Sequence, residues 1–212
     1  MKERTIEILK SLYTDFPGLQ VISGEIEGAL DILLEVYKRG NKLLVCGNGG
    51  SAADSEHIVG ELMKGFRLNR PLSDSMRMEI ECQEEGTRLA EFLQEPLPAI
   101  SLTAHTALST AFNNDVSSET VFAQQVLGYG KEGDVLLGIS TSGNSLNVVN
   151  AVRVAKALRI KTIGLTGRHG GKLKDLCDVT IAVPEEETYK VQELHLPVYH
   201  ALCAAVEYEK FG

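Results

Sequence analysis

No run of apolar residues in this 212-residue chain approaches the roughly 18 residues that a membrane-spanning helix needs. The segment from Met1 to Glu7 also lacks the apolar core of a signal peptide. The few cysteines form no CxxC pair, and they fit reduced thiols that pack inside the protein. They are Cys46, Cys82, Cys177 and Cys203. We therefore expect a cytoplasmic protein with no membrane partner.

An excess of positive charge is also lacking. The chain has 21 Lys and Arg against 29 Asp and Glu, for a net charge of −8. Binding to nucleic acid through bulk charge needs the opposite balance, so we expect no nucleic-acid partner, although a local phosphate pocket is still allowed. There are no internal repeats, and a composition that is 43% hydrophobic and 24% charged is ordinary for one globular domain over residues 1–212.

Five short apolar runs alternate with helical patterns. The predicted strands are Leu43–Cys46, Ala99–Leu102, Val135–Ile139, Thr162–Leu165 and Val179–Val183. The predicted helices cover 51–64, 106–127 with a break, 145–158 and 188–210. Strands that are apolar throughout and alternate with helices indicate a parallel sheet covered on both faces. We predict an α/β three-layer sandwich around a five-stranded, mostly parallel sheet, with ligands at the carboxyl ends of the strands.

Two segments stand outside this alternation. Residues 1–40 have helical spacing in two pieces broken at Pro17-Gly18, which predicts a helical arm on the domain or on a sister subunit. Its apolar stripe consists of Val21, Ile22, Ile26, Ala29, Leu30, Leu33, Leu34 and Tyr37. Residues 67–96 are crowded with charge and bracketed by Pro71 and Pro96, which predicts a solvated insertion, or a lid, that contains a helix.

A glycine-rich turn follows the first predicted strand. Gly47, Gly49 and Gly50 let the backbone turn tightly and approach a ligand, and Ser51 then opens a helix. We expect Ser51 and the first helix amides to face outward, where they would attract a phosphate. The run also resembles the dinucleotide pattern G-x-G-x-x-A, but no acidic residue ends a second strand about 20 residues later. We therefore expect no nucleotide cofactor.

A second turn, Gly138-Ile-Ser-Thr-Ser-Gly-Asn-Ser145, follows the third strand and opens another helix. It supplies four hydroxyls, from Ser140, Thr141, Ser142 and Ser145. Such a concentration of neutral donors favours phosphate binding, although a single serine would also serve as an ordinary helix N-cap. No lysine follows in P-loop register, which argues against hydrolysis of a nucleoside triphosphate.

Two helices carry candidate chemical groups. His57 and Glu61 are four residues apart and share one helix face, where they form a metal site, a base with its neighbour, or a simple surface contact. The last helix offers Gln192, His195 and His200, of which His195 fits a buried core residue. Pro197 removes one hydrogen bond from this helix and predicts a kink.

These motifs together resemble the phosphoheptose isomerases, the sedoheptulose 7-phosphate isomerases of the sugar isomerase (SIS) domain superfamily. The matching stretches are Cys46–Ser51, the helix with His57 and Glu61, Asp134–Ser145, Leu165–Gly167 with Gly170–Lys172, and Gln192-Glu-x-His with His200. The resemblance covers nearly the whole chain except 67–96. It implies a flavodoxin-like sandwich that assembles as a homotetramer with sites between subunits.

The resemblance also implies roles for individual residues. The implied phosphate and sugar contacts are Asn48, Gly49, Gly50, Ser51, Glu61, Asn114, Asp115, Ser140, Thr141, Ser142, Ser145 and Gln192. The implied zinc ligands are His57, Glu61, Gln192 and His200. Gln192 and His200 are about 12 Å apart along an ideal helix, so sharing one metal requires leaning side chains, a kink or a neighbouring subunit.

The implied reaction moves a proton between C1 and C2 of a ketose phosphate through an enediol. This needs a base beside the carbon, an acid at the carbonyl oxygen and a fixed phosphate. Our hypothesis makes Glu61 the base and His200 the acid, while a bound zinc ion would polarise the carbonyl and compete for Glu61.

The chain departs from the family pattern at two places besides the insertion. The family usually carries a basic residue shortly after the matching glutamate, where this chain has Lys64-Gly65, and often an aspartate before the matching glutamine, where it has Tyr189-Lys190. Isomerisation of another ketose phosphate is therefore one alternative. A non-catalytic phosphosugar-binding or interaction module, of the DnaA initiator-associating type, is the other, but the pair of Glu61 and His200 argues against it.

Overall fold

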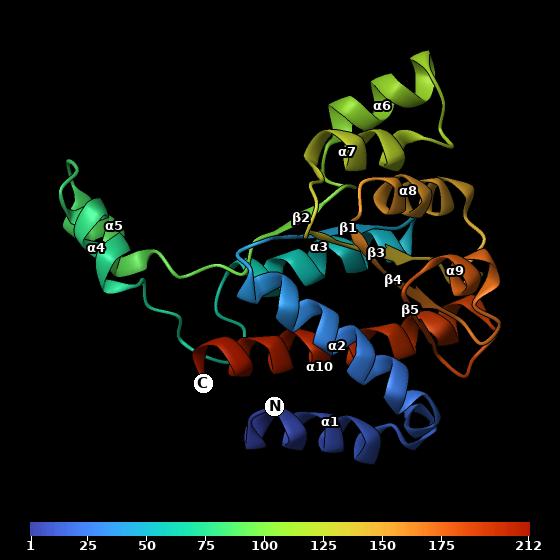
Figure 1. Cartoon of the computed structure of the whole chain (residues 1–212), viewed down its shortest axis with the longest axis horizontal. Helices are drawn as coiled ribbons and strands as arrows, with labels where there is room; N and C mark the ends of the chain where they lie inside the picture. Colours follow the sequence, from blue (N-terminus) through green and yellow to red (C-terminus); the bar gives the residue numbers. More distant parts are fainter.

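A five-stranded parallel sheet forms the centre of the protein, seen in a computed structural model that describes all 212 residues (Figure 1). The strands are β1 (Leu43–Cys46), β2 (Ala99–Ser101), β3 (Val135–Ile139), β4 (Lys161–Thr166) and β5 (Val179–Ala182). Their order is β2-β1-β3-β4-β5, and all four neighbouring pairs are parallel. The predicted α/β sandwich is confirmed, and its sheet is parallel throughout.

Alternation along the strands divides the core into two layers. In β1, Leu43 and Val45 pack on one face, and Leu44 and Cys46 pack on the other. Successive side chains of a strand point to opposite faces, so a strand covered by helices on both sides must be apolar at every position. All four residues of β1 are accordingly buried.

The helices form two layers, one on each face of the sheet (Figure 1). One layer holds the 3₁₀ helix η1 (Pro17–Ile22), α2 (Ser23–Lys38), α3 (Gly50–Met63) and α10 (Thr188–Phe211), and α1 (Glu3–Asp15) packs on the side of α10 away from the sheet. The other holds α6 (Thr106–Asp115), α7 (Val121–Tyr129), α8 (Leu146–Ala157) and α9 (Gly171–Leu176). The helix pattern over 106–127 is broken, as the sequence predicts.

The N-terminal helices pack on their own chain. α1 lies along α10, and α2 packs against β5 and α10 (Figure 1). The predicted stripe of α2 is buried at Ile26, Ala29 and Leu30, but Val21 is 76% exposed because it lies in the 3₁₀ turn, out of register with the stripe. α10 continues without interruption through Pro197. No helix of the protein is both long and apolar enough to cross a membrane.

The charged segment forms a helical hairpin, not a single helix. It contains α4 (Asp74–Glu81) and α5 (Gly86–Phe92), which pack on each other and stand away from the body on two linkers (Figure 1). An antiparallel bridge between Pro71 and Gln94 closes its base. No residue of α4 is buried. The hairpin therefore lies outside the hydrophobic core.

A buried ion pair fixes the chain where it leaves α3 for the hairpin. The Arg70 guanidinium donates to Glu207 on α10 at 2.7 Å, and to the carbonyl oxygens of Leu62 at 2.7 Å and Glu61 at 3.2 Å. The same Glu207 carboxylate accepts from three successive backbone N–H groups, at residues 66–68. Buried charges are tolerated when every polar atom is paired in this way. The pair therefore anchors the carboxyl end of α3 to α10.

Candidate active site

The two predicted phosphate loops lie side by side at one edge of the sheet. β1 and β3 are neighbours, with Cys46 paired to Gly138, so the loops that follow them start from adjacent positions. The chain leaves β1 for β2 on one side and returns to β3 on the other. In open parallel sheets this reversal of strand order leaves a crevice at the carboxyl ends, which is the usual place for a ligand.

The first loop requires its glycines. A Cβ on Gly47 would lie 2.7 Å from the Ser51 Cβ, and Gly49 has a φ of +56°. No side chain caps the helix that follows. The expectation that Ser51 faces outward is wrong for its side chain, which is only 3% exposed because it packs against Gly47.

The first loop is joined to the helix after β3 by a pair of amides. Asn48 and Asn147 exchange two hydrogen bonds of 2.9 Å each. Asn147 was not among the residues that the sequence singled out, and its only signal there was a position in the first turn after the serine-rich loop. This reciprocal pair holds the two walls of the crevice at a fixed separation.

The second loop is held by its own hydroxyls. Ser140 is 3% exposed and lies 2.9 Å from the Ser145 hydroxyl oxygen, while Thr141 is half-buried and Ser142 is exposed. Gly143 has a φ of +66°, and a Cβ there would lie 1.9 Å from the carbonyl oxygen of Gly170. The loop after β4 therefore buttresses this one from behind. Ser142 is the most exposed of the four hydroxyl-bearing residues and is therefore the best placed to meet a ligand.

Three predicted residues meet between α3 and α10. His57 Nε2 lies 3.2 Å from Glu61 Oε1 and 3.4 Å from His200 Nε2. Glu61 also forms a 3.1 Å ion pair with Lys64. Phe66 packs beside the His200 ring, with 5.5 Å between the ring centroids. The candidate acid and base thus share one small polar cluster, although they are far apart in the sequence.

His57 is held from behind by two residues that the sequence did not reveal. Tyr199 Oη lies 2.9 Å from His57 Nδ1 and 3.3 Å from Asp54 Oδ1. Asp54 is one helix turn before His57 and Tyr199 is next to His200, but neither position is informative without the packing of α3 on α10. The other oxygen of Asp54 is buried without a partner.

The surroundings shift the protonation of several groups. Partial burial, followed by the nearby His57, lowers the pKa of His200, and Glu61 offsets this only in part. His200 is therefore a neutral imidazole near pH 7. Burial lowers the pKa of His195 to about 4, which fits the buried core residue expected from the sequence.

Gln192 lies apart from this cluster. A Cβ on Gly50 would be 2.5 Å from Gln192 Nε2. The side-chain amide of Gln192 therefore lies at the start of α3 and not beside His200. Within the chain, no group of three or more His, Cys, Asp or Glu side chains is arranged to hold a metal ion. The four predicted zinc ligands are therefore not brought together, because Gln192 and His200 stay two turns apart on one helix.

The predicted sugar contacts on α6 are also separate. Asn114 and Asp115 are exposed and hydrogen-bonded to each other at 2.8 Å. α6 packs on α7, on the face of the sheet opposite to α3 and α10 (Figure 1). Neither residue joins the cluster of its own chain.

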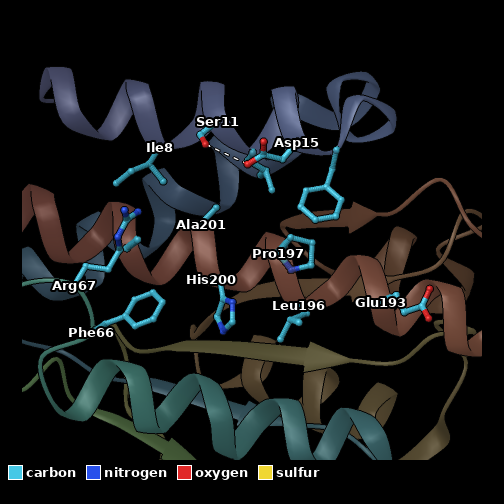
Figure 2. Close-up of a pocket in the computed structure, with 13 residues that line it drawn as sticks. Ile8, Ser11, Asp15, Phe66, Arg67, Glu193, Leu196, Pro197, His200 and Ala201 are labelled. Carbon is cyan, nitrogen blue, oxygen red and sulfur yellow. Dashed lines mark hydrogen bonds between the residues drawn. The ribbon is translucent and has the colours of Figure 1, made fainter.

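A groove of about 510 Å³ runs between α1 and α10 (Figure 2). Its walls are largely apolar, and His200 is the only predicted site residue among those that line it. Figure 2 shows His200 extending from α10 towards α3, beside Phe66. The groove therefore reaches the chemical cluster at His200.

The structure explains one departure from the family pattern. A Cβ on Gly65 would lie 2.4 Å from the carbonyl oxygen of Leu68, and the Gly65 N–H donates to Gln94 at the hairpin base. No larger residue fits there without a shift of the backbone. Lys64, next to it, supplies the positive charge beside Glu61.

Comparison with known proteins places the chain in a family. The model of the SIS domain family matches residues 19–95 and 84–167, so the chain belongs to the SIS domain proteins. Its similarity to phosphoheptose isomerases extends over nearly the whole length. It is 44% identical to the phosphoheptose isomerase of Clostridium acetobutylicum over 89% of this chain and 84% of that protein. With the one from Synechocystis it shares 37% identity over 100% and 96% of the two chains.

The fold agrees with a solved relative. The phosphoheptose isomerase of Neisseria gonorrhoeae superposes with a TM-score of 0.73 at 32% identity, covering 97% of this chain and 94% of that one. The family resemblance seen in the sequence is therefore confirmed, as is the fold that it implies.

Proposed function

We propose that this protein is a cytoplasmic phosphosugar isomerase that converts D-sedoheptulose 7-phosphate to D-glycero-D-manno-heptose 7-phosphate through an enediol. The observation that carries the proposal is the contact of Glu61 and His200 with His57, beside the crevice of the two serine-bearing loops. In this proposal the base and the phosphate site lie along α3, and the acid faces them from α10. The similar proteins named phosphoheptose isomerase support the seven-carbon substrate.

The spacing of these groups fits a long substrate. Ser51 and Glu61 are ten residues apart on α3, which is about 15 Å at 1.5 Å per residue, and His57 is about 9 Å from Ser51. A ketose phosphate anchored at the loops must be several carbons long for C1 and C2 to reach this cluster. A triose phosphate bound there would leave the carboxylate without a proton to take.

In the proposed mechanism, a Glu61 oxygen takes the proton from C1, and the electron pair left behind forms the C1–C2 double bond of the enediol. His200 donates a hydrogen bond, and then a proton, to the oxygen on C2. Return of a proton to C2, with loss of the proton on O1, gives the aldose. The loops contribute by fixing the phosphate, so that C1 remains beside Glu61.

We further propose that zinc binds at this cluster. Zinc–ligand bonds of about 2.0–2.1 Å place tetrahedral ligand atoms about 3.3 Å apart. His57 Nε2 is 3.2 Å from Glu61 Oε1 and 3.4 Å from His200 Nε2, close to this separation, but the three side chains do not form a metal-binding arrangement as they stand and would have to adjust. His57, His200 and Glu61 would hold the ion, with Gln192 as the expected fourth ligand after a side-chain movement. When bound, zinc would supply a Lewis acid to the substrate carbonyl.

We propose a homotetramer with sites between subunits, as the family resemblance implies. Exposure of Asn114 and Asp115 on the far face supports this, because in one chain they contact none of the other site residues. A second copy would bring these side chains to the crevice.

The test is turnover of a panel of ketose phosphates, with and without a chelator, followed by NMR for aldose formation. We expect sedoheptulose 7-phosphate to be turned over most efficiently, and Glu61→Gln to lower kcat by about 10²–10⁴-fold, because the variant keeps its shape but loses the base. Full turnover by Glu61→Gln would sink the assignment of the base. No turnover of any substrate would favour a binding module, and preference for another sugar would redefine the substrate. Unchanged activity after complete metal removal would exclude a catalytic zinc ion.

A further inference from the structure

The outward face of α5 is apolar and has no partner within the chain. Leu89, Phe92 and, directly after the helix, Leu93 follow one another at three- and four-residue steps, so they share one face. These residues are 49%, 75% and 47% exposed. Neighbouring apolar side chains that remain exposed together mark an interaction site, whereas single ones do not. The hairpin stands away from the body, which leaves this face open to another molecule (Figure 1).

The packing of the hairpin explains why its large side chains lie outside. Gly86 and Ala90 are four residues apart on the other side of α5, and both are buried. A Cβ on Gly86 would collide with the carbonyl oxygen of Ile80 on α4, so the two helices approach closely there. Small residues therefore fill the contact between α4 and α5, and the large ones can be buried only by a partner from outside.

The charges beside this face fit a second copy of it. Arg88 and Glu91 are three residues apart and lie along one edge of the face. On α4, Arg77 and Glu81 form an ion pair at 2.9 Å, whereas Arg88 and Glu91 form none within the chain. A twofold axis that pairs two α5 helices antiparallel brings the same edge of each together. Arg88 of each copy then faces Glu91 of the other.

The rest of the hairpin is unsuited to such a contact. Four glutamates belong to α4 and to the turn that leads into α5, namely Glu79, Glu81, Glu84 and Glu85. Two copies of α4 brought together would place these like charges against each other, at a cost in free energy. α5 itself carries one cation and one anion, which complement a second α5.

We propose that the α5 face, made by Leu89, Phe92 and Leu93, is an interface between two copies of this chain. The copies are related by a twofold axis, and two reciprocal ion pairs between Arg88 and Glu91 set their register. About two turns of helix from each copy make a small interface, so the contact is reversible on its own. It does not depend on the proposed isomerase activity.

Cross-linking of the full chain tests the contact. In this register the twofold axis passes beside Leu89, so Leu89→Cys brings two thiols together across it. Cys82→Ser is included because Cys82 is the exposed native cysteine. We expect a short bismaleimide to join two copies of this protein. Thr87→Cys in the same background should give about tenfold less linked dimer, because residues two apart do not share a helix face. Equal linking of the two variants, or none with Leu89→Cys, would overturn the proposal.

Charge substitutions in the Leu89→Cys protein test the register. Arg88→Glu and Glu91→Arg each place like charges opposite one another, and each should lower the linked fraction by about 3–10-fold. Mixing the two variants should restore linking between them, because the glutamates of one copy then face the arginines of the other. A pair formed within one chain gives no such recovery, and its absence would overturn the reciprocal pairing. Circular dichroism checks that each variant is folded, and turnover of ketose phosphates enters neither result.

Discussion

At the scale of single residues, the start of α3 is where substitution should separate binding from stability. Gly50 lies against the Gln192 amide, and a Cβ there would come within 2.5 Å of it. We expect Gly50→Ala to displace the Gln192 side chain and raise KM several-fold with little loss of stability, since the flexible end of a side chain moves easily. Steady-state kinetics and thermal unfolding would measure both effects.

Gly60 provides the matched control in the same helix. A Cβ there meets nothing within 4 Å. Gly60→Ala should raise the free energy of unfolding by about 0.5–1 kcal/mol, because alanine restricts the unfolded chain and favours the helix. It should leave KM unchanged. An unchanged KM in Gly50→Ala would show that Gln192 does not contact the substrate.

At the scale of elements, one carboxylate joins the starts of two central strands. Asp134 is fully buried and accepts from the Lys42 ammonium at 2.6 Å and from the backbone N–H groups of Lys42 and Lys131 at 3.1 and 2.9 Å. Burial alone would raise the pKa of Asp134, but these hydrogen bonds together lower it. The contribution to stability is therefore present above the ordinary aspartate pKa of about 4 and is lost as the pH falls below it.

Asp134→Asn should accordingly lower the free energy of unfolding by about 1–3 kcal/mol at pH 7. The difference in the free energy of unfolding between this variant and the unsubstituted protein should shrink as the pH falls from about 5 to about 3. Urea unfolding at several pH values measures it, with the exposed Asp175→Asn as a control that should change little. A difference that stays constant with pH would contradict the role given to this carboxylate.

The hairpin of α4 and α5 is an element that the core does not need. Pro71 and Gln94 pair at its base, so a two-residue Asn-Gly turn can replace residues 72–93. We expect the shortened protein to fold with a melting temperature within a few degrees of the original, because α4 and α5 pack chiefly on each other. Circular dichroism and turnover would be measured together. Loss of folding would show that the hairpin supports the core.

At the scale of the whole molecule, the separation of Asp115 from Glu61 tests whether subunits share sites. If the two residues act from different copies, Glu61→Gln and Asp115→Asn would each be nearly inactive. When the two variants are mixed, unfolded and refolded together, about one site in four should be active. Such a site receives its intact Glu61 from one variant and its intact Asp115 from the other. Light scattering would give the size of the assembly. No recovery in mixed oligomers would contradict sites shared in this way.

The sequence by itself determined the architecture of this protein and the local character of its loops. Fully apolar strands alternating with helices allow only a parallel sheet covered on both faces, and the glycines and serines after β1 and β3 identify loops that turn tightly. These features depend on neighbours in the chain, which a sequence shows directly. The break before α7 and the two-part arm were predictable for the same reason.

Only the tertiary structure decided which side chains meet. The packing of α3 on α10 brings His57 to His200 and places Tyr199 and Asp54 behind it, while it keeps Gln192 at the other end of α3. Such contacts join residues more than 90 positions apart, and they depend on how the helices are oriented on the sheet. A pattern of neighbouring residues holds no information on that orientation.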